Sequence, residues 1–215
     1  MEKLLALLSV VQLTKQQPLT GYSVAGVKLA ELPTLAEHHY TSAFSALLVG
    51  NKIKNGGGVI DTEKLVAMLL IHDLGELFGG DIAAPLSRAY PELRELKDKI
   101  GDRAIDLLFK QLSDSEQTYF KNLYAEFEHG SSDEKWVGKI LDQLDHQLFL
   151  EHHGHEQKMT NNATSYRPDF IKKHIYDLAE RIIDPITKKI MQEIVQTFID
   201  DYFKRGFIGL NELLS

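Results

Sequence analysis

The sequence predicts an all-α protein, and three observations carry that prediction. Apolar residues recur at helical spacing through most of the chain, and no segment shows the strict alternation that indicates a strand. Residues that cap helices precede several of the periodic segments. Glycine-rich or polar stretches lie between them. With 43% hydrophobic residues, the chain has enough apolar material for a core that needs no disulfides.

The N-terminal part contains three predicted helices. Residues 1–11 are interpreted as an amphipathic helix of a cytoplasmic protein rather than a signal peptide, because no small-residue cleavage site follows their apolar stretch. Residues 36–52 and 63–74 are the next two, joined by a flexible loop at 55–58. The helix over 63–74 is apolar nearly all round, which predicts a buried central helix. The helix over 36–52 is predicted from an apolar stripe, namely Tyr40, Ala43, Phe44, Leu47 and Leu48.

The second half follows the same pattern. Residues 74–86, rich in glycine, alanine and proline, are expected to be partly irregular, and a helix is predicted over 91–112. Ser113 or Asp114 caps the next helix, and Ser131 or Ser132 caps one that runs to about Leu150. Residues 151–167 form a predicted polar loop. Two closing helices complete the chain, and the second begins at Asp184-Pro185, a cap followed by proline at the first helical position.

Composition narrows the function classes. The net charge of −7 argues against a long nucleic-acid surface, which needs clustered lysine and arginine. The chain has no cysteine, so disulfides and cysteine metal sites are excluded, and a reducing compartment such as the cytoplasm is expected. No apolar run reaches 18 residues, so no membrane span is predicted. The length of 215 residues suits a single domain over 1–215.

The most informative feature is the pair His72-Asp73, which stands at the end of a buried apolar helix. Burying either group costs several kcal/mol unless it is paired or bound to a metal. A hydrogen-bonded pair at a helix C-terminus is one interpretation, and a metal site is the other. Glu76 and Asp81 follow within the same segment, and His38 begins another amphipathic helix upstream. These additions favour the metal site, whose other ligands must come from other helices.

At this point the chain resembles the HD-domain phosphohydrolase superfamily, and within it the HD-domain 5'-deoxynucleotidases. The resemblance covers about residues 18 to 150 and rests on three motifs: Glu37-His38-His39-Tyr40, the run from His72-Asp73 through Glu76 to Gly80-Asp81-Ile82, and Lys139-x-x-Asp142-x-Leu144. It implies an HD-type helical bundle that binds a divalent metal through His38, His72, Asp73 and Asp142. The C-terminal helices, over 168–205, are then expected to pack on this core or to form the interface of a homodimer.

Two ligand assignments remain open on the residues alone. Helical periodicity favours Asp145, which lies at the edge of an apolar stripe, whereas the family pattern favours Asp142. His39 competes with His38, and the family pattern favours His38.

The expected chemistry is phosphate ester hydrolysis. A site of histidines and carboxylates suits Mn²⁺, Co²⁺, Fe²⁺ or Zn²⁺, which polarise a phosphoryl oxygen and activate water. Glu76 and Asp81 are the candidates to orient that water or to protonate the leaving alkoxide, and either could instead contact a second metal. The expected substrate is a small phosphate ester, a nucleoside 5'-monophosphate. The alternative is a regulatory module that keeps the metal site without turnover.

One departure from the family weakens the nucleotidase assignment. The related enzymes have an arginine that contacts the substrate phosphate, and Ala25 stands in its place here. Lys28 is the expected substitute, although a lysine lacks bidentate geometry. The remaining histidines are assigned no role. His152, His153 and His155 fall in the predicted polar loop, and His129, His146 and His174 are predicted to lie at the surface.

Overall fold

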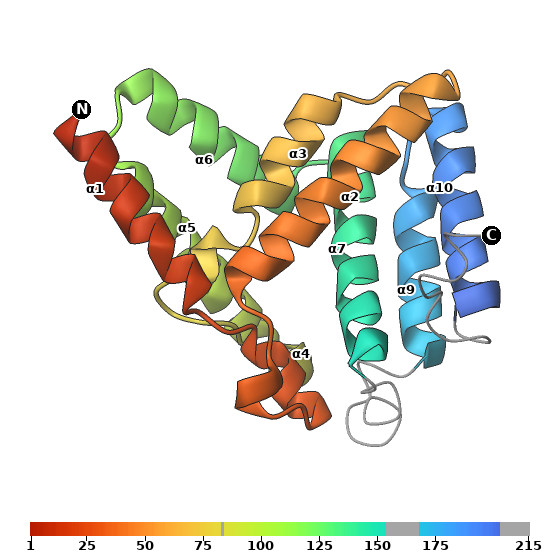
Figure 1. Ribbon diagram of the computed structural model, residues 1–215, viewed down its shortest axis with the longest axis horizontal. Coiled ribbons are helices and arrows are strands. Elements are labelled where there is room, and N and C mark those ends of the chain that lie inside the picture. The colour runs from red at the N-terminus through yellow and green to blue at the C-terminus, as the bar shows by residue number, and fades with distance from the viewer. Residues whose placement is uncertain (83, 154–167, 203–215) are drawn as a thin grey trace.

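A computed structural model describes residues 1–82, 84–153 and 168–202 (Figure 1). Within these residues there is no β-strand, only an isolated antiparallel bridge between Pro18 and Thr34, and the all-α prediction is confirmed. The α-helices are α1 (Glu2–Val11), α2 (Leu35–Asn55), α3 (Thr62–Ile71), α4 (Ala84–Ala89), α5 (Pro91–Phe109), α6 (Asp114–His129), α7 (Asp133–His152), α9 (Pro168–Glu180) and α10 (Pro185–Thr197). Short turns of other helix types are η1 (Gln12–Lys15), η2 (Thr20–Ala25), η3 (Leu29–Glu31), η4 (Leu74–Glu76) and η6 (Phe198–Tyr202).

Helices α2, α3 and α7 form the centre of the molecule. Helix α2 packs along α3, and both pack against α7. Helices α9 and α10 follow on one side of α7, whereas α1, α5 and α6 lie on the other side of the α2–α3 pair (Figure 1). Buried apolar side chains from all of these layers except α1 form one hydrophobic cluster. A site between α2, α3 and α7 is therefore held by the most extensively packed elements.

The predicted helix caps are present. Ser113 forms a capping box with Glu116, the hydroxyl of Ser132 accepts from the Lys135 N–H, and Asp184 caps α10 with Pro185 at the next position. Helix α2 begins with a further capping box, between Thr34 and Glu37. An N-cap of this kind stabilises a helix by about 1 kcal/mol. The sequence therefore located the starts of α6, α7 and α10 correctly.

The predicted helix over 63–74 is shorter than expected. Helix α3 ends at Ile71, and the chain continues through the 3₁₀ turn η4. This turn lies directly against α5, where a Cβ atom on Gly75 would stand 2.9 Å from the Cα atom of Gly101. The two glycines allow this close approach, and it brings α5 to the segment that follows His72-Asp73.

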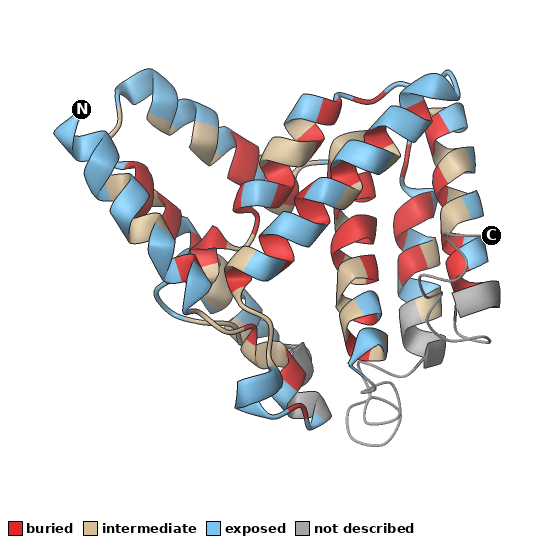
Figure 2. Cartoon of the chain, viewed as in Figure 1, coloured by how far each residue is buried: buried red, intermediate tan, exposed pale blue. Residues whose placement is uncertain are grey.

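The stripe that predicts α2 is not the face that the fold buries. Four of its members, Tyr40, Phe44, Leu47 and Leu48, are between 46% and 68% exposed. Figure 2 shows buried positions along α2. The buried residues are small or polar along most of the helix. They are Leu35, His38, His39, Ser42, Ala43, Ala46, Gly50 and Ile53. The helix was correctly predicted, but its orientation follows close packing and the buried histidines rather than hydropathy.

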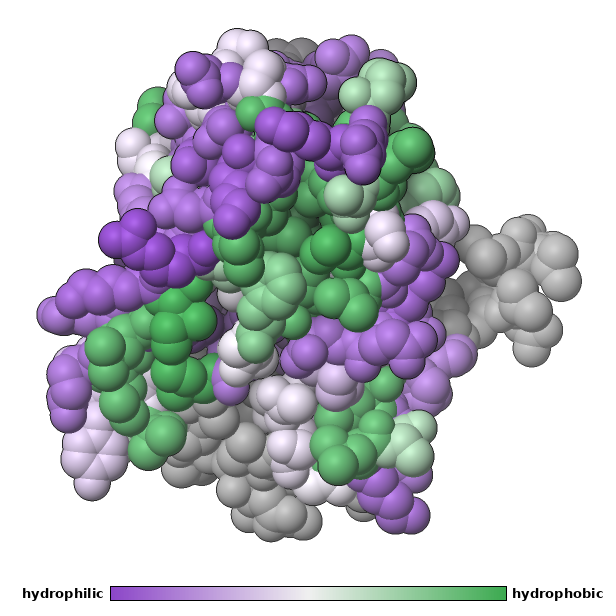
Figure 3. Space-filling model, turned by 90° about the vertical axis from the view of Figure 1, so that its left-hand side faces the viewer, coloured by the Kyte–Doolittle hydropathy of each residue, from purple (hydrophilic) through white to green (hydrophobic). Residues whose placement is uncertain are grey.

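Further apolar side chains are exposed on α1. Leu4, Leu5 and Leu8 lie at the surface, and apolar patches are visible on the side of the molecule where α1 lies (Figure 3). Across the described residues, no helix combines the length and the hydropathy that crossing a membrane requires. Residues 154–167, including His155 of the predicted histidine cluster, and the end of the predicted C-terminal helix at 203–205 lie outside the described residues.

Candidate metal centre and cleft

Three helices bring the four predicted metal ligands together. His38 comes from the first turns of α2, His72 and Asp73 follow the last turn of α3, and Asp142 lies in α7. The Nε2 atoms of His38 and His72 are 3.1 Å apart. Asp142 Oδ1 lies 3.3 Å from His38 Nε2 and 3.6 Å from His72 Nε2, and Asp73 Oδ2 lies 3.6 Å and 3.4 Å from the same two atoms.

Hydrogen bonds at Nδ1 direct the Nε2 atoms of His38 and His72 toward the cluster. His38 Nδ1–H donates to Asp145 Oδ2 over 2.7 Å, and His72 Nδ1–H donates to the Leu69 carbonyl over 3.0 Å. Because a carboxylate and a carbonyl only accept, each Nδ1 carries a proton, and Nε2 is the nitrogen of each ring that faces the cluster and would bind an ion after losing any proton it holds. Metal-bound histidines are held in this way in most sites. Asp145, the competitor to Asp142, thus contacts the rear of His38 rather than the centre of the cluster.

The electrostatics of the cluster favour a cation. Burial by itself lowers the pKa of His38, but the carboxylates of Asp142 and Asp145 outweigh it and raise that pKa to about 10. Burial opposes ionisation of Asp73, yet the neighbouring His72 and His38 lower its pKa to about 2. Asp142 Oδ1 is buried and has no hydrogen-bond partner among the residues that the structure describes. A divalent cation at this point would satisfy that oxygen and both Nε2 lone pairs, so the residues present fit a metal.

His39 occupies a different position from His38. It is buried beside the cluster, with its ring centroid 5.1 Å from that of His72, but its Nε2 has no hydrogen-bond partner among the described residues. Burial and the neighbouring His72 lower its pKa to about 3. His39 is therefore neutral at ordinary pH and is not among the groups of converging donor atoms found in the described part of the chain.

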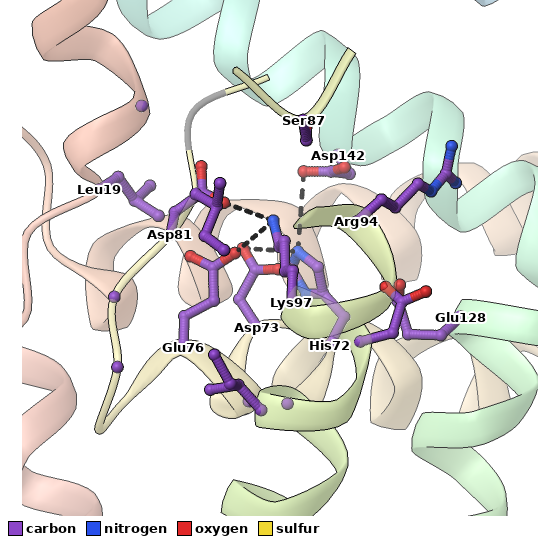
Figure 4. A pocket seen from close by; sticks show the side chains of 18 of the residues that line it. Leu19, His72, Asp73, Glu76, Asp81, Ser87, Arg94, Lys97, Glu128 and Asp142 are labelled. Atoms are coloured by element: carbon purple, nitrogen blue, oxygen red, sulfur yellow. Dashed lines mark hydrogen bonds and ion pairs between the residues drawn. The ribbon is translucent and has the colours of Figure 1, made fainter. Parts of the chain in front are cut away.

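A cleft of about 510 Å³ adjoins the cluster. His72, Asp73 and Asp142 line one part of its wall, and Glu76 and Asp81 line another (Figure 4). The cationic side chains in its lining come from α5 and α7, namely Arg94, Lys97 and Lys139. Lys28 is not part of the lining. It is exposed on the surface, with its Nζ 3.8 Å from Glu31 Oε1.

Lys97 connects the two predicted catalytic carboxylates, and sequence analysis did not find it. Its Nζ lies 3.0 Å from Glu76 Oε1 and also contacts Asp81 Oδ1 (Figure 4). Burial raises the pKa of Glu76, and the nearby Asp73 adds to the rise while Lys97 opposes it, giving about 8. Lys97 lies in the middle of an ordinary amphipathic helix, so no local signal distinguished it from a surface lysine.

His146 is also nearer the cluster than expected. It was predicted to be a surface residue, but its Nε2 lies 3.0 Å from Asp142 Oδ1 and its side chain lines the cleft. Its Nδ1 is 2.5 Å from the hydroxyl of Tyr22, a buried residue of η2. The spacing of four residues after Asp142 was the available signal, because residues four apart share a helix face.

Comparisons with known proteins identify the family of this chain. The family model for the HD domain matches residues 14–186. A 5'-deoxynucleotidase HDDC2 from Xenopus laevis is 28% identical over 144 residues, which cover 67% of this chain and 66% of that protein. The protein of that name from Danio rerio is 29% identical over 159 residues, covering 73% and 72%. The chain thus spans about two thirds of the length of these relatives.

Solved structures show the same fold. The PH0347 protein of Pyrococcus horikoshii has a TM-score of 0.64 and 25% identity, with coverage of 90% of this chain and 96% of that one. A predicted metal-dependent phosphohydrolase from Magnetospirillum magnetotacticum has a TM-score of 0.65, with 95% of each chain covered. The latter is 17% identical to this chain, so the likeness concerns the fold alone.

Proposed function

Since this chain belongs to the HD domain family and is a metal-dependent phosphohydrolase, we propose that it releases inorganic phosphate from a nucleoside 5'-monophosphate. The observation that carries this proposal is that the Nε2 atoms of His38 and His72 lie within 3.6 Å of carboxylate oxygens of both Asp73 and Asp142, beside a cleft that also holds Glu76 and Asp81. We further propose that one HD domain occupies residues 1–215. A cytoplasmic location stays a prediction from the sequence.

The four proposed ligands offer two imidazole nitrogens and two carboxylate oxygens. This set suits Mn²⁺, Co²⁺, Fe²⁺ or Zn²⁺. When bound, the ion supplies Lewis-acid polarisation of the phosphoryl group and activation of water. Asp145, as the acceptor from His38 Nδ1, orients that ring from behind.

Glu76 is the proposed general acid. With a pKa of about 8, its carboxyl group holds a proton near neutral pH and can donate it to the leaving alkoxide. Asp81, held by Lys97, is the proposed group that orients the attacking water. Lys97 contacts both side chains and so fixes them relative to each other, and its charge offsets that of the Asp81 carboxylate.

Arg94 is a better candidate than Lys28 for the phosphate contact that Ala25 does not supply. Arg94 lines the cleft three residues before Lys97, whereas Lys28 does not. A guanidinium also offers the bidentate geometry that a lysine lacks. Arg94→Ala is expected to raise KM for the nucleotide by about tenfold or more, the effect of losing a charged hydrogen bond. Lys28→Ala is the matched control and should leave KM unchanged. Equal effects of the two changes would remove Arg94 from this role.

We also propose a homodimer that uses the exposed face of α2. A two-fold interface needs a self-complementary patch, and this face presents a row of large apolar side chains. The rings of Tyr40 and Phe44 are already stacked, with an interplanar angle of 12°. The four exposed residues thus form a surface that a second copy of the chain could cover.

The decisive experiment is a substrate panel. Purified full-length protein, loaded separately with Mn²⁺, Co²⁺, Fe²⁺ or Zn²⁺, is tested for phosphate release from ribo- and deoxyribonucleoside 5'-monophosphates and from simple phosphate esters. Turnover of nucleotides above that of simple esters supports the proposal. Metal binding without phosphate release from any of these compounds would contradict it and favour the regulatory module.

A further inference from the structure

His146 stands one helical turn after Asp142 on α7, so the two side chains project on the same side of the helix. Its Nε2 lies 3.0 Å from Asp142 Oδ1, and its ring centroid is 4.8 Å from that of His38. One ligand atom each from His38, Asp142 and His146 can be chosen so that all lie within 4.8 Å of one another. The motif that defines the proposed metal centre does not include His146.

Three imidazoles around this point are held alike. His38 and His72 each engage Nδ1 in a hydrogen bond at the rear of the ring, with Asp145 and with the Leu69 carbonyl. His146 Nδ1 is engaged by the Tyr22 hydroxyl. A hydroxyl oxygen can accept, so Nδ1–H of His146 can donate to Tyr22 and leave the Nε2 lone pair available. A partner behind the ring is the arrangement that most metal-bound histidines share.

The distances are those of ligands around one ion. Metal–nitrogen and metal–oxygen bonds of about 2.0–2.2 Å place ligand atoms about 3.0 Å apart at right angles and about 3.4 Å apart at the tetrahedral angle. The separations of Asp142 Oδ1 from His38, His72 and His146 Nε2, and of Asp73 Oδ2 from His38 and His72 Nε2, run from 3.0 to 3.6 Å. The donor atoms fall into two groups that share His38, one with Asp142 and His146 and one with His72 and Asp73. Asp142 Oδ1 makes no hydrogen bond within the described residues, although His146 Nε2 is only 3.0 Å away. A separation of this length also fits two ligands of one ion at right angles.

We infer that His146 is a fifth protein ligand of the metal, held in place by Tyr22, an inference that rests on the proposed metal centre. Tyr22 is buried and packs its ring against His146 and Phe149, with centroids 5.2 Å and 5.0 Å away. The donor set becomes three imidazoles and two carboxylates. A nitrogen-rich set favours transition metals over Mg²⁺ and leaves fewer positions for water or substrate.

The test uses the full chain loaded with Co²⁺ and proton NMR in water. A metal-bound imidazole whose Nδ1–H is hydrogen-bonded gives a far-shifted exchangeable signal, so wild type should show three such signals. His146→Gln should show two and bind Co²⁺ at least about tenfold more weakly in competition with a chelator. Glutamine keeps N–H donors that could still hydrogen-bond Asp142, so a merely structural His146 would be replaced without this loss. His129→Gln, a change of another cleft histidine, is the matched control and should keep all three signals.

Tyr22→Phe gives a second, independent measurement. It should retain three signals, with one exchanging faster because its Nδ1–H has lost its acceptor. Two signals in wild type, or three in His146→Gln, would overturn the inference, and the latter would identify another imidazole as the third ligand. Wild type that binds no Co²⁺ and none of the other three metals would instead refute the metal centre itself. If His146→Gln fails to fold, two signals in wild type still overturn the inference, and faster exchange of one of three signals in Tyr22→Phe assigns that signal to His146.

Discussion

Helix α2 presents two faces of opposite character. The side toward α3 and α7 carries His38, His39 and Ser42, which are 5% exposed or less. The side toward solvent carries Tyr40, Phe44, Leu47 and Leu48, each at least 46% exposed. A single helix thus buries ionisable groups and exposes apolar ones. His38 has partners there, namely the carboxylates of α7 and of Asp73 at the end of α3, whereas His39 Nε2 has none among the described residues.

The outer face of α2 contributes to the protein in a different way. Its apolar side chains contribute little to the folded monomer, because they remain in water after folding. They are therefore free to serve association with a second copy. Variants of the inner face are tested by their metal content and phosphate release, and variants of the outer face by their oligomeric state.

The largest effect is expected at the inner end of α3. His72→Ala should abolish stoichiometric metal binding, with affinity lowered by more than about 100-fold, because it removes a proposed direct ligand. Elemental analysis after dialysis measures the bound metal. Tyr40→Ala, on the outer face of α2, is the control and should bind as much metal as wild type. Full occupancy in His72→Ala would remove this residue from the site.

Glu76→Gln should separate chemistry from metal binding. Glutamine keeps the size of the side chain but cannot transfer a proton, and loss of a general acid typically costs about 10²- to 10⁴-fold in kcat. Phosphate release per bound metal ion is the measurement, with Asp81→Asn assayed beside it. If Glu76→Gln is active and Asp81→Asn is inactive, Asp81 rather than Glu76 is the general acid.

The two aspartates of α7 should differ in their effect on the metal. Asp142→Asn is expected to weaken metal affinity more than Asp145→Asn, because Asp145 acts only through His38. The expected cost of Asp145→Asn is about 10- to 100-fold, the range for a residue that orients a ligand. Isothermal titration with Mn²⁺ compares the variants. If Asp145→Asn weakens metal affinity more than Asp142→Asn does, Asp145 is the ligand, as helical periodicity favoured.

On the outer face, the double change Leu47→Glu and Leu48→Glu should convert the proposed dimer to a monomer and leave metal content unaltered. Charges placed in an apolar interface lose their hydration without gaining partners. Sedimentation velocity and elemental analysis on the same sample test both halves of the statement. A wild-type protein that is already monomeric at high concentration would end the dimer proposal.

The smallest effect concerns His39 in the metal-free protein. Its pKa falls from 6.5 to about 3 on folding, so between these values the unfolded chain binds more protons than the folded one. Stability against unfolding should therefore decline as pH falls from 6.5 toward 3. His39→Leu should make this decline shallower. Urea unfolding of metal-free wild type and variant at several pH values measures it, and parallel curves would contradict the predicted shift.

The sequence determined the helical fold class, the cap positions and the family motif. Each of these is a local property: periodicity over one helix, a Ser113 or Ser132 placed before it, or a short run such as His72-Asp73. The pairing of His38 with His72 was reached through the family resemblance, because residues 34 positions apart carry no local sign of contact.

Only the tertiary structure decided which side of α2 faces inward, which aspartate of α7 points at His38 Nε2, and where Lys97 and His146 lie. These outcomes depend on how neighbouring helices rotate and approach, as when Gly75 and Gly101 let α5 reach η4. Hydropathy predicted an apolar stripe on α2 but not that this stripe faces solvent. The buried side instead carries polar residues such as His38, because the carboxylates there stabilise it. Asp142 and Asp145 are three residues apart on one helix, and their separate roles follow from which atoms of His38 each one meets.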